Sequence, residues 1–144
     1  MKKLPIFLIV LLGLILITSA ALAADGGAPR VSTLSGVEEV PPADPDGSGF
    51  VRITLNHGQG QVCWELNYAG IDAPFAAHIH AAPAGVNGPV VVPLSPIAFG
   101  CREVSRDLIK SIIQQPELYY VNVHNTPYPG GAIRGQLSNP GLSD

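Results

Sequence analysis

Two histidines separated by a single residue are the side chains in this sequence best placed to hold a metal ion. His78 and His80 stand in the run Ala77-His78-Ile79-His80-Ala81. On an extended strand these two side chains point to the same face, about 6–7 Å apart along the strand. Two imidazoles at that spacing can both reach one ion.

A second alternating run adds a third histidine. In Tyr120-Val121-Asn122-Val123-His124 the two valines share one face, and the other three side chains share the opposite face. If Ile79 and the valines face the core, three of the four histidines lie on the outer face of the same sheet. We therefore predict that His78, His80 and His124 bind a transition metal, with copper as the expected ion and zinc as the alternative.

Neighbouring polar residues support this interpretation or its structural alternative. Asn122 is expected on the same face as His124 and could orient that ring. Glu38 could accept a hydrogen bond from a histidine, or lie at a solvated strand end. In the structural alternative, the three histidines form a hydrogen-bonded cluster that ties strand ends together. His57 lies in a glycine-containing turn and is expected to be solvated.

Arg134 has two interpretations. It could attract an anion toward a bound metal, or it could form an ion pair on the outer face of its strand, with Glu38 or Glu65 as partner. The ion pair is the ordinary role of an outward arginine, and we expect it here.

The N-terminal part has the pattern of a secretory signal peptide. Lys2 and Lys3 precede an apolar run, and Ala21-Leu22-Ala23 supplies a small-x-small cleavage site. We expect residues 1–23 to be removed and the protein to be exported, to the periplasm or out of the cell.

After that cleavage, we expect a flexible tether at 24–30, one domain at 31–138 and a short tail at 139–144. Residues 24–144 hold 6 basic and 11 acidic side chains. A chain with this charge has no basic surface for nucleic acid or an anionic membrane, and we expect neither as a partner.

The only two cysteines, Cys63 and Cys101, lie in the expected exported part. In an oxidising compartment they are expected to form one disulfide, although a thiolate metal site is an alternative. Alternation along Gln61–Tyr68 turns Cys63 away from the core, where it could be joined to the segment that carries Cys101.

Short alternating runs separated by Gly and Pro predict the fold. About seven strands and one helical segment, Arg102 to Gln115, with Ser105 as its cap, indicate an all-β protein. The expected architecture is an antiparallel β-sandwich or Greek-key barrel with one short helix, like immunoglobulin domains or superoxide dismutases.

Five ordered blocks resemble the CHRD domain, which occurs in chordin and alone in exported bacterial proteins. The resemblance implies an extracytoplasmic β-sandwich and no defined activity, and it covers residues 31–137. The blocks are Leu34–Pro42, Ala77–His80, Asn87–Val91, Tyr120–Asn125 and Pro129–Leu137.

A second resemblance concerns chemistry. The order H-x-H, a later strand histidine, a Gly-rich turn and an arginine is similar to copper/zinc superoxide dismutases. That similarity implies copper on His78, His80 and His124, with Arg134 attracting the anionic substrate. The histidine that would bridge two metals and the zinc loop have no counterpart in this chain.

Three functions follow from these predictions. The first is a small extracytoplasmic binding module that holds a metal ion or an unknown envelope ligand and is not an enzyme. The second is a copper-dependent dismutase-like oxidoreductase. The third is a structural or adhesive module in which the histidines bind no metal.

Overall fold

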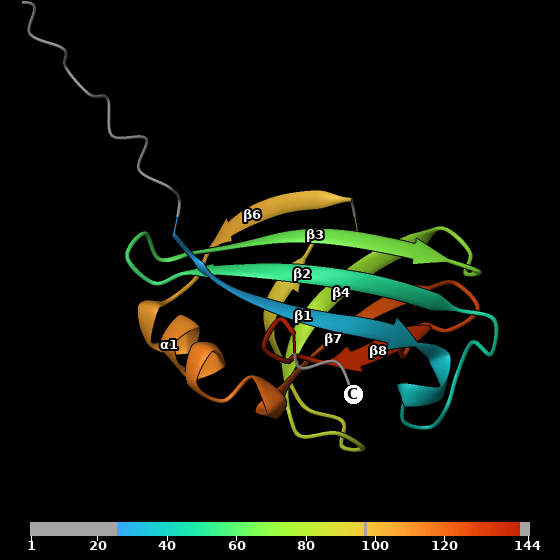
Figure 1. The fold of residues 1–144 in the computed structure, drawn as a ribbon. Helices are drawn as coiled ribbons and strands as arrows, with labels where there is room; N and C mark the ends of the chain where they lie inside the picture. Colours follow the sequence, from blue (N-terminus) through green and yellow to red (C-terminus); the bar gives the residue numbers. More distant parts are fainter. Residues whose placement is uncertain (1–25, 97, 142–144) are drawn as a thin grey trace, which may run out of the picture.

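An antiparallel sheet of eight strands curls into a nearly closed barrel in the computed structural model (Figure 1). The structure describes residues 26–96 and 98–141, so the predicted signal peptide at 1–23 lies outside the described residues. The strands follow the order β5-β4-β7-β8-β1-β2-β3-β6 across the sheet. Their bounds are β1 Ala28–Ser35, β2 Ser48–Asn56, β3 Gln61–Ala69, β4 Pro74–Ala81, β5 Val90–Leu94, β6 Phe99–Glu103, β7 Tyr119–Asn125 and β8 Ile133–Gln136.

The predicted all-β fold with one short helix is confirmed. Alternating residues of β2 and β3 face the barrel interior, as their sequence pattern predicted. Their inward side chains are at most 5% exposed: Val51, Ile53, Leu55, Val62, Trp64 and Leu66. Ile79, Val121 and Val123 complete the core from β4 and β7 and are fully buried. Ile79 and the two valines therefore face the core, as we assumed when we placed the three histidines on the opposite face of the sheet.

Helix α1, Arg106–Gln114, is shorter than the predicted segment. Ser105 caps it, because its hydroxyl accepts a hydrogen bond from the Leu108 amide at 3.3 Å. Residues 102 and 103 belong instead to β6, which pairs with β3. Two short 3-10 turns, η1 at Gly36–Glu38 and η2 at Pro116–Leu118, complete the elements. No helix within the described residues has the length and hydrophobicity that a bilayer span requires.

The N-terminal boundary also differs from the sequence expectation. Strand β1 begins at Ala28 and pairs with β2 from there, opposite Leu55. Residues 28–30 are therefore part of the sheet and not of the tether. Arg30 is only 7% exposed, and its guanidinium donates to the carbonyl groups of Pro29 and Ile113.

The predicted disulfide between Cys63 and Cys101 is present. The two residues lie directly opposite each other on β3 and β6, with an S–S distance of 2.11 Å and Cα atoms 4.0 Å apart. The bond joins residues 38 positions apart and fixes the edge strand β6 to the sheet. Such a bond stabilises the fold mainly by restricting the unfolded chain.

Strand β7 is buried on both faces. All seven of its residues are buried, although only the alternate set from Tyr119 to Val123 faces the barrel interior. The outer set, Tyr120, Asn122 and His124, is covered by other parts of the chain. The sequence pattern predicted an outer face for these residues, and the structure shows that this face is not open to solvent.

A double variant Cys63→Ala/Cys101→Ala should unfold more easily than the wild type. The disulfide closes a loop of about 39 residues, so its loss should lower the free energy of unfolding by about 3–4 kcal/mol. Urea denaturation measures this difference. A reducing agent should lower the free energy of unfolding of the wild type by the same amount and should not change that of the double variant. If the double variant and the oxidised wild type were equally stable, the disulfide would not stabilise the fold.

Candidate metal centre

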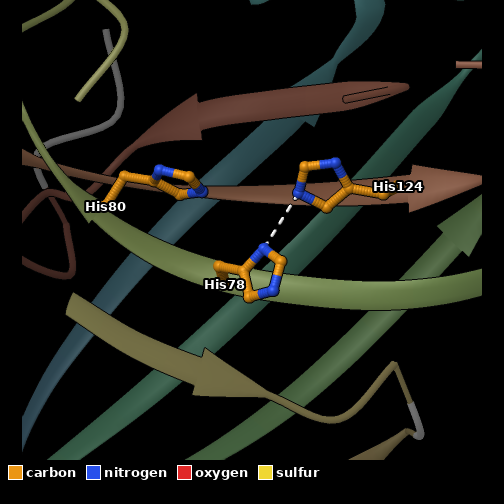
Figure 2. A group of neighbouring side chains, drawn as sticks. All are labelled: His78, His80 and His124. Atoms are coloured by element: carbon orange, nitrogen blue, oxygen red, sulfur yellow. Dashed lines mark hydrogen bonds between the residues drawn. The ribbon is translucent and has the colours of Figure 1, made fainter. Parts of the chain in front are cut away.

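The pairing of β4 with β7 brings the three predicted histidines together. His78 lies opposite Asn122 and His80 opposite Tyr120, while His124 lies opposite Ala76. His124 is therefore diagonal to His78 across the two strands, within reach of a long side chain. Figure 2 shows the three rings gathered on one face, two from β4 and one from β7.

His78 and His124 are joined by a hydrogen bond between their rings. His78 Nδ1 lies 2.9 Å from His124 Nε2 (Figure 2). His124 Nδ1 lies 3.1 Å from the Pro129 carbonyl, which can only accept, so the neutral ring carries its proton on Nδ1. In this tautomer His124 Nε2 accepts from His78 Nδ1. The Asn122 amide oxygen, 3.0 Å from the same nitrogen, is itself an acceptor and then contacts the ring without receiving a hydrogen bond from it.

His80 has a ring nitrogen with no partner. Its Nδ1 lies 2.8 Å from the Gly88 carbonyl and donates to it. Its Nε2 therefore carries a lone pair, and this atom is buried with no hydrogen-bond partner. In Figure 2 one nitrogen of the His80 ring is directed toward His124. A buried acceptor without a partner is unusual in a folded protein and requires an explanation.

Three ring nitrogens thus face a common space. One ligand atom from each histidine lies within 4.8 Å of the other two. Two nitrogens that bind one ion at about 2.0–2.1 Å are about 3.3–3.6 Å apart, so the ligand atoms must come about 1 Å closer where they are farthest apart. The hydrogen bond between His78 and His124 must open at the same time, with the His78 proton transferred to Nε2.

The environment of His78 and His124 favours the neutral imidazole, which is the form that binds metal. Burial, with smaller effects of His124 and His80, lowers the pKa of His78 to about 4. Burial also lowers the pKa of His124, and its hydrogen bond to the Pro129 carbonyl works in the opposite direction. Protons therefore compete weakly with a metal ion at neutral pH.

A family model decides the membership of this chain. The model of the CHRD domain matches residues 30–137, which is nearly all of the described fold. The chain belongs to the CHRD family. No curated protein and no solved structure matches it significantly. The similarity to copper/zinc superoxide dismutases therefore stays a prediction from the sequence motif.

Three side chains contact the histidines of this CHRD domain, and one of them, Asn122, was predicted to do so. The amide oxygen of Asn122 lies 3.0 Å from His124 Nε2, so this side chain contacts the ring it was predicted to orient. Tyr120 stacks on His80 with ring centres 4.7 Å apart and planes inclined by 9°. Phe75 stacks less closely on His124 and is 57% exposed at the edge of the site.

Arg134 does not form the ion pair expected from the sequence. It is 1% exposed, and it donates hydrogen bonds to the Pro83 and Val86 carbonyls and to the Asn87 side chain. Its guanidinium carbon lies 3.4 Å from the centre of the Tyr120 ring. The segment at 83–87 covers this arginine, and alternation alone cannot reveal such a cover.

Of the two alternatives predicted for Glu38, the solvated position is the one observed. The turn η1 leaves Glu38 exposed and buries its neighbour Glu39, which is 5% exposed. Burial raises the pKa of the Glu39 carboxyl to about 7, and the charge of Arg134 opposes that rise. The sequence did not show that Glu39 would be buried, because a one-residue change in the path of the turn decides which glutamate is buried.

Sequence reasoning also missed the two carbonyl groups that fix the histidine tautomers. They belong to Gly88 and Pro129, in two of the blocks that resemble the CHRD domain. An Asn-Gly pair such as Asn87-Gly88 is typical of a tight turn, but a backbone acceptor carries no side-chain signature. Only the docking of these segments over β4 and β7 gives them this role.

The variant Glu39→Gln should change how stability depends on pH. Because the folded-state pKa of Glu39 is raised above its ordinary 4.5, the carboxyl favours folding at low pH and progressively loses that contribution between pH 4.5 and 7. The variant should therefore gain stability relative to the wild type across this interval, by about 2–3 kcal/mol at pH 8.

Urea denaturation of both proteins from pH 4 to 8 measures this effect. Titration of the histidines is common to both proteins and cancels in the difference. A constant difference across that range would show that the Glu39 carboxyl does not titrate as its burial requires.

Proposed function

We propose that this CHRD protein is a small extracytoplasmic binding module that holds a transition-metal ion, copper in preference to zinc. The ligands are His78 Nδ1, His80 Nε2 and His124 Nε2. The unpaired lone pair of His80 carries the proposal, because it is buried and belongs to a group of three convergent imidazoles. A bound ion would give this atom the partner that the protein lacks.

The structural alternative explains less of the geometry. Hydrogen bonds account for both nitrogens of His124, for Nδ1 of His78 and for Nδ1 of His80. A purely structural cluster would also satisfy His80 Nε2, or would expose it to water. Metal binding instead gives His80 Nε2 a partner, the ion that it would share with His78 Nδ1 and His124 Nε2.

The donor set favours copper. Imidazole suits copper and zinc alike, and divalent copper binds nitrogen ligands more tightly than zinc does. Three protein ligands leave a coordination position open for water or an external ligand. His78 is the least buried of the three, so we place that position on its side of the site.

Export is part of the same proposal. The N-terminal sequence has the pattern of a signal peptide, and the Cys63–Cys101 disulfide fits an oxidising compartment. In such a compartment a metal-binding module meets ions that have already left the cytoplasm.

The dismutase-like alternative has less support. A residue that attracts an anion to the metal must present its charge to solvent, and Arg134 is 1% exposed with its hydrogen-bond donors directed at the 83–87 segment. We therefore propose binding, without turnover, as the function of the site.

Calorimetric titration with copper and with zinc at pH 7 tests the proposal. The wild type should bind one ion, and the variants His78→Ala, His80→Ala and His124→Ala should each weaken binding about a hundredfold or more, because each removes a direct ligand. His57→Ala is the matched control. His57 is exposed in the turn between β2 and β3, and its removal should leave the affinity unchanged.

Thermal denaturation of each variant separates loss of the site from loss of the fold. A folded wild type that binds neither ion would contradict the proposal. Equal weakening in His57→Ala and in the three site variants would also contradict it, since the ion would then bind elsewhere.

A further inference from the structure

The proposed ligand set supplies no negative charge to the ion. All members of the cluster are histidines, and among the described residues it includes no carboxylate or thiolate. His80 and His124 are 8% and 7% exposed, so water compensates little of the charge of a bound ion. In such a setting each additional unit of positive charge is strongly unfavourable.

A permanent positive charge lies close behind this cluster. Strand β7, which carries Tyr120, lies between β4 and β8, which carry His80 and Arg134. The Arg134 guanidinium stacks on Tyr120 at 3.4 Å, and Tyr120 stacks on His80 at 4.7 Å. A guanidinium remains protonated in proteins, so this charge does not depend on pH.

The partners of Arg134 do not neutralise it. Its described hydrogen bonds go to two carbonyl groups and one amide, all of them uncharged. Glu39 is the acidic group that interacts with it electrostatically, and burial raises the pKa of that carboxyl to about 7. At neutral pH the compensation is therefore incomplete.

We infer that the three-histidine site binds cuprous copper more tightly than cupric copper, and that the buried charge of Arg134 contributes to this preference. The inference rests on the proposed function and specifies the oxidation state of its ligand. Reduction of the bound ion from Cu(II) to Cu(I) consumes one electron from an external donor such as ascorbate. It breaks no bond in the protein.

The number of ligands favours the same ion. Cupric ions prefer tetragonal coordination with four or more donors, whereas this site offers three. The d¹⁰ cuprous ion has no such geometric preference.

Two dissociation constants test the inference on the purified full chain. The Kd for Cu(I) is measured without oxygen against a chromophoric Cu(I) chelator, and the Kd for Cu(II) is measured against a Cu(II) chelator. The wild type should bind Cu(I) at least about tenfold more tightly, which corresponds to a rise of about 59 mV in the potential of the bound couple above that of the free ions.

Charge variants identify the origin of the preference. Arg134→Met should lower the ratio of Kd for Cu(II) to Kd for Cu(I) by about ten- to thirtyfold, the effect of one unit charge at about 8 Å with an effective dielectric constant of about 20. Glu39→Gln, measured at pH 8, should raise the same ratio, because it removes an opposing negative charge. Arg52→Met, at an exposed position of β2, is the matched control and should leave it unchanged.

The outcomes separate this inference from the proposed function. Binding of Cu(II) as tight as or tighter than binding of Cu(I) would overturn the inference and leave the metal site standing. Failure of both ions to bind would contradict the proposed function itself. If Arg134→Met does not fold, Glu39→Gln still decides the electrostatic argument, and an unchanged ratio in that variant would contradict it.

Discussion

The hydrogen bond from His80 Nδ1 to the Gly88 carbonyl determines the chemistry of this site. It fixes the tautomer of His80 and leaves the lone pair of Nε2 directed into the cluster without a partner. The bond requires the 82–89 segment to lie close against β4. Gly88 permits that approach, because a Cβ atom at this position would lie 2.1 Å from the Ala81 carbonyl oxygen. Arg134 also holds this segment in place, because its guanidinium donates hydrogen bonds to the carbonyls of Pro83 and Val86.

Burial of the outer face of β7 links the fold to the site. One face of this strand packs in the barrel core, and the other carries Tyr120, Asn122 and His124 beneath covering segments. The 127–131 turn supplies the Pro129 carbonyl to His124, and the 82–89 segment supplies the Gly88 carbonyl to His80. The two carbonyl groups fix two rings in the tautomers that leave their Nε2 atoms free to accept. The result is a group of three imidazoles, two of them buried, beside one arginine.

Much of this arrangement could be predicted from alternation in the sequence. The period-two patterns predict that Val51 and Trp64 face the barrel interior, and that His78, His80 and His124 share one face of the sheet. The capping preference of Ser105 predicts where α1 begins. The two cysteines predict the disulfide. What alternation cannot show is which loops dock on the outer face of a sheet. Arg134 therefore looked like a surface residue, and the burial of Glu39 was not predicted. Both have one cause, since burial by loops depends on contacts between segments far apart in the chain.

The most direct test of the central claim is a crystal structure of the copper-loaded protein with anomalous diffraction at the copper edge. The account predicts a single anomalous peak bonded to His78 Nδ1, His80 Nε2 and His124 Nε2, with the hydrogen bond between His78 and His124 opened and the His80 contact to Gly88 retained. A peak at any other group, or an unaltered histidine cluster in crystals that contain copper, would contradict it.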